Sequence, residues 1–330
     1  MLKGLYILDK HAYDNIYGEE ERKDILKYVD IYGPPQTAET IKNNISLLKD
    51  ADVIFSGWGC PHMDKEFIEA APNLKAVFYG AGSIKYLVSD AFWDKGILIT
   101  SAYAANAIPV AEYTLSQILY SLKLGWYYAL STKRDKKYPP KKVAPGGYKS
   151  TIGIISLGMV GRRVCELLRP FDVKVIAYDP FVKKEDAAKL NVKLCSLEDI
   201  FKNADVISLH TPWLKETEGM IKGIHFSSMK QNATFINTAR GAVVNENEMI
   251  DVLTKRSDIT VVLDVTYPEP PRPKSPLYIL PNVVLTPHIA GSMYKECNRM
   301  GRYMVEELER YVKGEKLRYM ITRERSAFLA

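Results

Sequence analysis

The sequence predicts an α/β protein of two domains built on largely parallel sheets. Two observations carry this prediction. Short apolar runs of β-forming residues alternate with helical patterns along most of the chain, and this alternation favours parallel strands joined by crossover helices. A glycine-containing turn at residues 156–161 follows one such strand and opens one such helix, which is the arrangement of a dinucleotide-binding unit. The length of 330 residues is sufficient for two domains with separate cores.

Neither composition nor charge points to a nucleic acid or a membrane as a partner. The net charge is only +6, and the basic stretch 133–142 is expected to be a solvated loop. No apolar run approaches the roughly 18 residues of a transmembrane helix, and the first residues lack the apolar core of a signal peptide. The four cysteines lie far apart without metal-ligand spacing: Cys60, Cys165, Cys195 and Cys297. We therefore expect a cytoplasmic protein without a bound metal.

The first region predicts a sheet flanked by helices. Short apolar runs predict strands at residues 2–8, 53–55, 74–79 and 97–100. Helical spacing predicts helices at residues 19–28, 38–48 and 65–70. A longer apolar pattern at 106–124 predicts a helix that connects two domains, followed by a loop at 138–147.

The central unit spans residues 151–179. A strand at 151–156 leads into the glycine turn, a helix then continues to Pro170, and a second strand at 173–178 ends in Asp179. In such a unit the turn brings backbone N–H groups and a helix N-terminus to the pyrophosphate of a dinucleotide. An acidic residue about twenty positions further on accepts hydrogen bonds from the adenosine ribose.

The glycine fingerprint departs from the usual pattern at its first position. Ser156 stands where the first glycine is expected, whereas Gly158 and Gly161 occupy the second and third positions. The first position makes a tight turn that serine adopts with modest strain. By itself the turn is compatible with an ordinary strand–helix connection, and the flanking strand, helix and Asp179 favour dinucleotide binding.

Strands and helices continue to alternate after Asp179. Strands are expected at residues 206–209, 234–237, 259–263 and 283–285. Helices are expected at residues 197–202, 246–254 and 294–312. The last helix is expected to return and pack on the first domain, and the pattern of the tail at 317–330 is ambiguous.

Polar residues of catalytic type follow four of these strands, in turns at residues 210–212, 237–241, 264–270 and 286–291. Ligands of open parallel sheets bind at the carboxyl ends of the strands, so these turns should meet at one site. Hydride transfer to a 2-oxo acid needs a fork-shaped cation for the carboxylate, a proton donor, and a carboxylate that orients this donor. Arg240, His288 and Glu269 supply these three groups, although each residue taken singly is more often structural.

With these residues in view, the chain resembles the D-isomer-specific 2-hydroxyacid dehydrogenase family. The segment HTP at 210–212 with Thr217, the segment INTARGAVVNE at 236–246, DVTYPEP at 264–270 and LTPHIAG at 285–291 have the order and spacing of the family motifs. The resemblance implies that Arg240 binds the substrate carboxylate and polarises its carbonyl. It also implies that His288 is the acid–base group and that Glu269 orients it.

The same resemblance implies NAD as the cofactor. Gly158, Met159 and Val160 would lie under the pyrophosphate, Asp264 would contact the nicotinamide end, and Asp179 would hold the ribose and disfavour the 2′-phosphate of NADP. Lys183 and Lys184 follow closely and leave NADP as the less favoured alternative. The full set of expected cofactor contacts is Ser156, Gly158, Met159, Val160, Gly161, Asp179, His210, Thr211, Pro212, Thr217, Thr238, Ala239, Asp264 and Gly291.

Substrate contacts are expected from the first domain as well. The turn with Ala81, Gly82 and Ser83 resembles the family loop whose backbone N–H groups hold the substrate carboxylate. The family usually continues with an Asp-Asn pair, whereas residues 84–86 read Ile-Lys-Tyr here, so the subgroup is atypical. Trp58 and Tyr103 fall where family members place specificity side chains, and core packing is an equally good explanation for these aromatic residues. Arg240 and His288 complete the expected substrate contacts.

The implied architecture is a Rossmann-type NAD-binding domain, residues 104–294, inserted into a flavodoxin-like substrate domain, residues 1–103 and 295–330. Closure of the domains would exclude water from the hydride path. The family commonly forms homodimers through the NAD-binding domain, and the 106–124 helix with its following loop is the candidate contact.

Two other functions stay open on the same fold. A formate- or phosphite-type dehydrogenase is one of them, although formate enzymes pair the histidine with glutamine rather than glutamate. An NAD-sensing, corepressor-like binding protein is the other, and it can retain the same three residues, so only turnover separates it from an enzyme. A chain whose cofactor binding is weakened by Ser156 is a further variant of the enzyme hypothesis.

Overall fold

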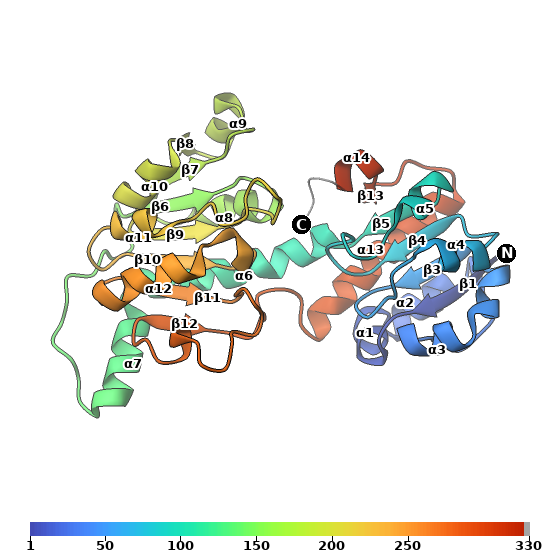
Figure 1. Cartoon of the computed structure of the whole chain (residues 1–330). Helices are drawn as coiled ribbons and strands as arrows, with labels where there is room; N and C mark the ends of the chain where they lie inside the picture. Colours follow the sequence, from blue (N-terminus) through green and yellow to red (C-terminus); the bar gives the residue numbers. More distant parts are fainter. Residues whose placement is uncertain (327–330) are drawn as a thin grey trace. The chain divides into compact units, whose positions relative to one another are not determined.

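The computed structural model describes residues 1–326 and divides the chain into two compact units. The first unit comprises Met1–Asn106 and the chain from Ser292 onward, and the second comprises Ala107–Gly291. Each unit is built around its own sheet (Figure 1). The boundaries expected from the sequence lie after residues 103 and 294, and the structural division falls after Asn106 and Gly291.

The first unit contains a six-stranded sheet with the order β13-β5-β4-β3-β1-β2. Its strands are β1 (Leu2–Ile7), β2 (Val29–Ile31), β3 (Val53–Ser56), β4 (Ala76–Tyr79), β5 (Leu98–Ser101) and β13 (Met320–Ile321). The first five strands are parallel, whereas β13 pairs antiparallel with β5. Every residue of β3 and β4 is buried, which is why these strands read as continuous apolar runs. The order of β1–β5 is flavodoxin-like.

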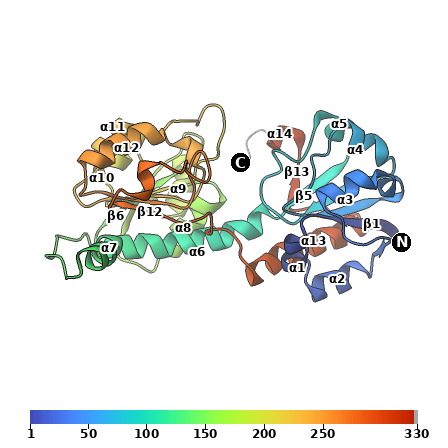
Figure 2. The same ribbon diagram turned by 60° about the horizontal axis from the view of Figure 1, so that its bottom comes forward.

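Helices cover both faces of this sheet (Figure 2). One layer contains α3 (Ala38–Asn43), α4 (Lys65–Ala70) and α5 (Asp90–Asp94), and the other contains α1 (Lys10–Ile16), α2 (Glu19–Ile25) and α13 (Lys295–Val312). The returning helix α13 buries residues three or four positions apart against the sheet, including Met300, Met304 and Leu308. It approaches α1 so closely that a Cβ on Gly301 would lie 1.8 Å from the carbonyl oxygen of Ile16.

The second unit contains a seven-stranded parallel sheet with the order β12-β11-β10-β9-β6-β7-β8. Its strands are β6 (Thr151–Ile155), β7 (Lys174–Tyr178), β8 (Val192–Leu194), β9 (Val206–Leu209), β10 (Thr234–Asn237), β11 (Thr260–Leu263) and β12 (Val283–Leu285). From β6 the chain first adds β7 and β8 toward one edge of the sheet, and then adds β9 to β12 toward the other edge. The position between β6 and β9 is therefore the switch point of a doubly wound Rossmann-type fold. The α/β fold class with a Rossmann-type domain is therefore confirmed.

Two helical layers also enclose this second sheet. One face is covered by α10 (Leu197–Asn203), α11 (Gly223–Ser227) and α12 (Glu246–Lys255), and the other by α6 (Tyr103–Leu122), α8 (Met159–Leu168) and α9 (Lys184–Lys189). The remaining α-helix of this unit is α7 (Gly125–Asp135), which follows α6 directly (Figure 2). Two 3₁₀ helices, η2 (Gly241–Val243) and η3 (Pro276–Tyr278), complete the unit.

Several expected elements need correction. The single helix expected at 38–48 is α3 followed by a 3₁₀ helix, η1 (Ile45–Asp50), because the chain turns at Asn44. The basic stretch expected to be a loop begins inside α7, which ends at Asp135. The ambiguous tail contains β13 and the short helix α14 (Arg323–Ser326), and its last residues, 327–330, lie outside the described part of the chain.

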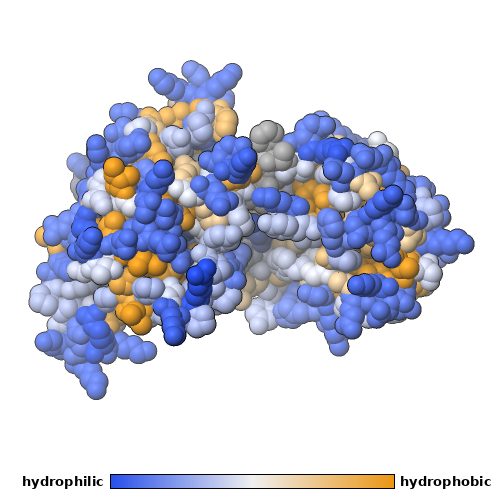
Figure 3. All heavy atoms as spheres, viewed as in Figure 1, coloured by the Kyte–Doolittle hydropathy of each residue, from blue (hydrophilic) through white to orange (hydrophobic). Residues whose placement is uncertain are grey.

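No helix within residues 1–326 is long and apolar enough to cross a membrane. The same residues contain no group of three or more His, Cys, Asp or Glu side chains placed to hold a metal ion. On the face shown in Figure 3, hydrophilic residues predominate and hydrophobic atoms gather in small patches.

Candidate active site

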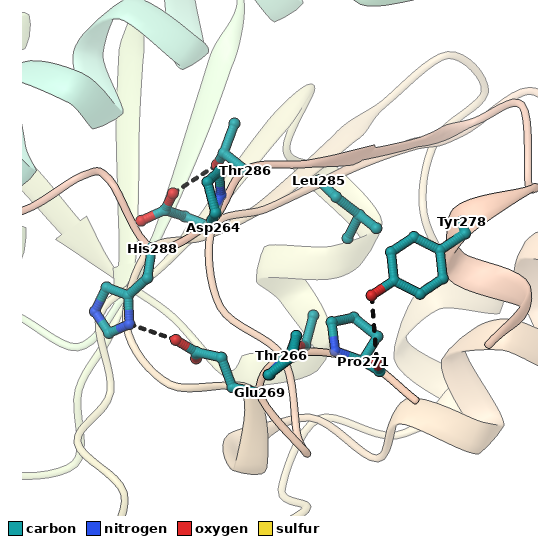
Figure 4. A pocket seen from close by; sticks show the side chains of 10 residues that line it. Asp264, Thr266, Glu269, Pro271, Tyr278, Leu285, Thr286 and His288 are labelled. Carbon is teal, nitrogen blue, oxygen red and sulfur yellow. Dashed lines mark hydrogen bonds and ion pairs between the residues drawn. The ribbon is translucent and has the colours of Figure 1, made fainter. Parts of the chain in front are cut away.

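A histidine–glutamate pair lies at the carboxyl ends of β11 and β12. His288 Nδ1 is 2.6 Å from Glu269 Oε1, and both side chains are about half exposed (Figure 4). An ionised carboxylate only accepts hydrogen bonds, so Nδ1 carries the hydrogen of this contact. The ring is thereby fixed, and Nε2 is left as the nitrogen that can exchange a proton with a bound substrate.

Asp264 builds the turn that carries His288. Its carboxylate is almost fully buried and accepts hydrogen bonds from the Thr286 hydroxyl at 2.5 Å and from the backbone N–H groups of Ile289 and Ala290, each at 2.9 Å. The backbone N–H of His288 donates to the carbonyl oxygen of Asp264 at 3.0 Å. His288 itself has a φ of 54°, a strained value for a residue with a side chain. Asp264 therefore holds the histidine turn in this conformation, a role that the sequence did not reveal.

This network continues into α6. The Tyr113 hydroxyl is 3.1 Å from Thr286 Oγ1, and burial raises the pKa of Tyr113. The Thr286 hydroxyl thus lies between α6 and the Asp264 carboxylate, and hydrogen bonds to Tyr113 and Asp264 fix its position.

Replacing Asp264 with asparagine is expected to lower the free energy of unfolding of the second unit by about 2 kcal/mol, because buried donors lose a charged acceptor. Thermal denaturation followed by circular dichroism measures this effect. Asp251→Asn is the control, since Asp251 is an exposed residue of α12. Equal midpoints for the two variants would show that the Asp264 carboxylate does not support the turn.

The turn carrying Arg240 follows β10, the neighbour of β11. The buried amide of Asn237 shapes it, because Nδ2 donates to the carbonyl oxygen of Arg240 at 3.0 Å and Oδ1 accepts from the N–H of Ala239 at 3.0 Å. A Cβ on Gly241 would lie 2.0 Å from the carbonyl carbon of Thr266. Glycine is therefore required where the arginine turn touches the segment that leads to Glu269. The three catalytic candidates consequently come from the ends of three adjacent strands.

A pocket lies beside the histidine–glutamate pair within the second unit (Figure 4). Its volume is about 440 Å³, and Glu269 and His288 are among its lining residues. The opposite wall contains Tyr278, whose hydroxyl donates to the carbonyl oxygen of Pro271 at 3.1 Å.

The glycine turn between β6 and α8 has the form that a dinucleotide needs. A Cβ on Gly161 would lie 2.1 Å from the carbonyl oxygen of Ser156, so the third glycine permits close packing of helix and strand. No atom lies within 4 Å of a Cβ built on Gly158. The open space there, at the N-terminus of α8, fits the approach of a pyrophosphate. Met159 is half exposed beside it, and Val160 is partly buried.

Asp179 joins the end of β7 to this turn. Its Oδ2 accepts from the N–H of Leu157 at 2.8 Å, and its Oδ1 accepts from the N–H groups of Phe181 and Val182 at 2.9 and 3.1 Å. A carboxylate has about four acceptor positions, so the geometry leaves capacity for a ribose hydroxyl.

Ser156 is stabilised at the first fingerprint position by a distant partner. Its φ is 75°, and its hydroxyl is 2.7 Å from the hydroxyl of Thr211. Its N–H donates to the carbonyl oxygen of Tyr178 at 2.8 Å. Thr211 follows β9, the strand next to β6, so this hydrogen bond spans the switch point of the sheet.

The other cofactor candidates from the sequence shape the same edge of the sheet. Burial lowers the pKa of His210 to about 3, so its ring, 3.0 Å from Ser208 Oγ, is neutral at pH 7. The Thr217 hydroxyl donates to the carbonyl oxygen of Pro212 at 2.6 Å and closes that loop. Thr238, next to Ala239, lies 3.1 Å from the Thr114 hydroxyl. Gly291 ends the second unit.

The candidate substrate loop of the first unit is held by Ser101, which the sequence did not single out. The fully buried Ser101 hydroxyl lies 2.8 Å from the carbonyl oxygen of Ala81 and 2.5 Å from that of Gly82. Ser83 follows in the same loop. Trp58 and Tyr103 follow β3 and β5, respectively, and Trp58 is 40% exposed. These residues thus gather along the carboxyl edge of the first sheet.

Comparison with known proteins agrees with this geometry. Residues 120–290, more than half of the chain, match the model of the D-isomer specific 2-hydroxyacid dehydrogenase, NAD binding domain. The chain belongs to the D-isomer-specific 2-hydroxyacid dehydrogenase family. Its second unit therefore contains the NAD-binding domain of that family.

Relatives in this family include D-3-phosphoglycerate dehydrogenases. The protein of that name from Archaeoglobus fulgidus is 33% identical over 256 residues, which are 78% of this chain and 49% of that protein. The one from Methanocaldococcus jannaschii is 29% identical over 296 residues, 89% of this chain and 56% of that protein. The chain thus spans about half the length of the curated relatives it matches.

Solved structures of the family share the fold. The NAD-complexed D-isomer specific 2-hydroxyacid dehydrogenase from Lactobacillus delbrueckii ssp. bulgaricus matches with a TM-score of 0.81 at 22% identity, covering 97% of this chain and 100% of that one. A D-2-hydroxyisocaproate dehydrogenase structure matches with a TM-score of 0.80 at 24% identity and the same coverage.

Two variants of Ser156 test how this residue is tolerated at the first position of the glycine fingerprint. Ser156→Gly removes the strain of a positive φ, roughly 1–2 kcal/mol, and also removes a hydrogen bond worth about 1 kcal/mol. We expect these effects to offset each other, so that stability in urea and NADH affinity change little. Ser156→Ala loses the hydrogen bond and keeps the strain, and it should be about 1 kcal/mol less stable than the native protein. A clear gain in NADH affinity for Ser156→Gly would show that Thr211 does not compensate for the strain.

Proposed function

We propose that the protein is an NAD-dependent oxidoreductase that transfers a hydride between NAD(H) and a D-2-hydroxy acid or its 2-oxo acid. One observation carries this proposal. The 2.6 Å contact between His288 and Glu269 lies at the ends of β12 and β11, and β11 is the neighbour of β10, the strand that precedes Arg240, in a member of this dehydrogenase family.

Each of the three candidate residues has a separate role in the proposed reaction. NAD(H), when bound, supplies or accepts the hydride at the substrate carbon. Arg240 binds the substrate carboxylate in a fork and polarises the carbonyl oxygen. His288 gives a proton from Nε2 to the forming alkoxide in reduction and removes it in oxidation. Glu269 keeps the ring oriented and supports the positive charge of the protonated ring.

Other residues of the second unit hold the cofactor in this proposal. Residues 158–160 lie under the pyrophosphate, and Asp179 binds the adenosine ribose and disfavours the 2′-phosphate of NADP. Backbone N–H groups of residues 81–83 hold the substrate carboxylate, so the first unit is the substrate domain. Trp58 and Tyr103 set the side-group specificity.

The proposal includes a homodimer formed through the NAD-binding domain. Large apolar side chains are exposed on α6, α7 and the loop that follows them, namely Tyr120, Leu130, Tyr138 and Val143. Burial of such side chains against a second copy would be favourable. Sedimentation of the native protein and of a Leu130→Glu variant tests the dimer, since a charge at this interface would produce monomers.

The reaction is tested by following NADH oxidation against a panel of 2-oxo acids, with NADPH in parallel. The panel runs from glyoxylate and pyruvate to hydroxypyruvate, phenylpyruvate and branched oxo acids. Turnover that disappears in His288→Ala supports the proposal. NADH binding without any turnover favours an NAD-sensing binding protein instead, and turnover of formate or phosphite alone favours the other dehydrogenase type.

A further inference from the structure

The segment after α13 is fixed beside the end of β5 in the first unit. The fully buried carboxylate of Glu307 on α13 accepts the backbone N–H groups of Arg318 and Tyr319 at 3.1 and 3.0 Å. The N–H of Ser101 donates to the carbonyl oxygen of Tyr319 at 3.2 Å, and β13 then pairs with β5. Arg323 forms ion pairs with Asp90 and Asp94 of α5. These contacts give α14 a defined position on the first unit (Figure 1).

Arg325 of α14 reaches Tyr103 from this position. Its Nη2 donates to the Tyr103 hydroxyl at 2.8 Å, and its guanidinium carbon lies 5.6 Å from the centre of the Tyr103 ring. The Tyr103 ring in turn meets Tyr319 edge-on at 6.3 Å. A hydrogen bond and a cation–π contact therefore orient the guanidinium of Arg325, which is an exposed residue.

The charge of Arg325 is not neutralised within the described residues. Three other arginines of the same region each contact two carboxylates: Arg302 contacts Glu21 and Asp24, Arg310 contacts Glu307 and Glu315, and Arg323 contacts Asp90 and Asp94. Within residues 1–326, Arg325 meets a neutral phenol instead and has no carboxylate partner. An oriented cation without an anion is the arrangement of an anion-binding side chain.

A chain of hydrogen bonds connects Arg325 to the candidate substrate loop. The N–H of Tyr103 donates to Ser101 Oγ at 3.3 Å, and this hydroxyl lies within hydrogen-bond distance of the carbonyl oxygens of Ala81 and Gly82. Two residues, Tyr103 and Ser101, therefore join Arg325 to the loop that holds the substrate carboxylate in the proposed function.

We propose that Arg325 is a specificity-determining residue that binds a second acidic group of the substrate, at the end opposite its 2-oxo acid. The substrate class is then the 2-oxo acids, and the corresponding hydroxy acids, with a distal carboxylate or phosphate. Both groups present oxygen pairs that match the guanidinium fork. This inference rests on the proposed function.

The test compares matched substrates with and without the distal charge. The ratio of kcat/KM for 2-oxoglutarate over 2-oxovalerate measures preference for a carboxylate, and the ratio for phosphohydroxypyruvate over hydroxypyruvate measures preference for a phosphate. We expect at least one ratio to exceed unity in the native protein and to fall by about 10- to 100-fold in Arg325→Gln, as for a lost hydrogen bond to a charged group. Arg325→Lys should retain part of the preference, and raising the salt concentration should reduce it.

Lys313→Gln is the matched control, because it removes one exposed positive charge of the first unit at the end of α13, outside the contacts that fix α14. Its ratios should stay near the native values. Native ratios at or below unity, or equal ratios in the native protein and Arg325→Gln, would overturn the inference while leaving the dehydrogenase proposal intact. Absence of turnover on every oxo acid would overturn both.

Discussion

His288→Asn is expected to lower the rate of oxo-acid reduction by about 10²- to 10⁴-fold, the usual contribution of a positioned acid–base group. Asparagine cannot exchange a proton with the alkoxide. The glycine turn and Asp179 belong to other loops, so NADH affinity should stay within a few fold of the native value. Steady-state kinetics and NADH fluorescence titration together measure the two quantities.

Glu269→Gln is the companion variant for His288→Asn. Glutamine can still accept from Nδ1 of His288, whose present contact with Glu269 is 2.6 Å long, but it brings no negative charge. Its rate should therefore fall less than that of His288→Asn. An active His288→Asn variant would assign proton transfer to another group and remove the main support for the proposed reaction.

Gly161→Ala is expected to lower the free energy of unfolding by about 3 kcal/mol, at the upper end of overpacking effects, and to abolish NADH binding. The new Cβ would lie 2.1 Å from the carbonyl oxygen of Ser156, which is backbone and cannot move aside as a side chain could. The start of α8 would have to shift away from β6, and the N–H groups at the turn would shift with it. Urea denaturation and NADH titration measure both effects.

Gly158→Ala separates binding from folding at the same turn. The added methyl group meets no atom within 4 Å, so stability should fall by less than about 1 kcal/mol, the cost of changing a helix N-cap glycine. NADH affinity should nevertheless drop, because the methyl group enters the space into which the pyrophosphate would fit. A Gly158→Ala variant with native NADH affinity would show that the dinucleotide does not approach this glycine.

Some strands could be predicted residue by residue because they are buried on both faces. The expected ranges 206–209, 234–237 and 283–285 are identical to β9, β10 and β12, since strands covered by helices on both sides appear as uninterrupted apolar runs. The strands β2 and β8 each contain an exposed charged residue in the middle, Asp30 and Lys193 respectively, so neither forms an apolar run. The helices α5 and α11 have only five residues each. Such short elements contain too few residues for a periodic pattern, and tertiary contacts stabilise them instead.

The sequence by itself determined the α/β fold with its Rossmann-type domain and the position of the glycine turn, and it predicted Arg240, Glu269 and His288 as the catalytic candidates, because strand patterns and turn motifs are local in the chain. Only the tertiary structure decided how these groups are held. Asp264 reaches the histidine turn across 25 residues, Ser156 meets Thr211 across 55, and Arg325 meets Tyr103 across 222. Hydrogen bonds between residues so far apart depend on which strands become neighbours in the sheets, and this information has no local pattern in the sequence.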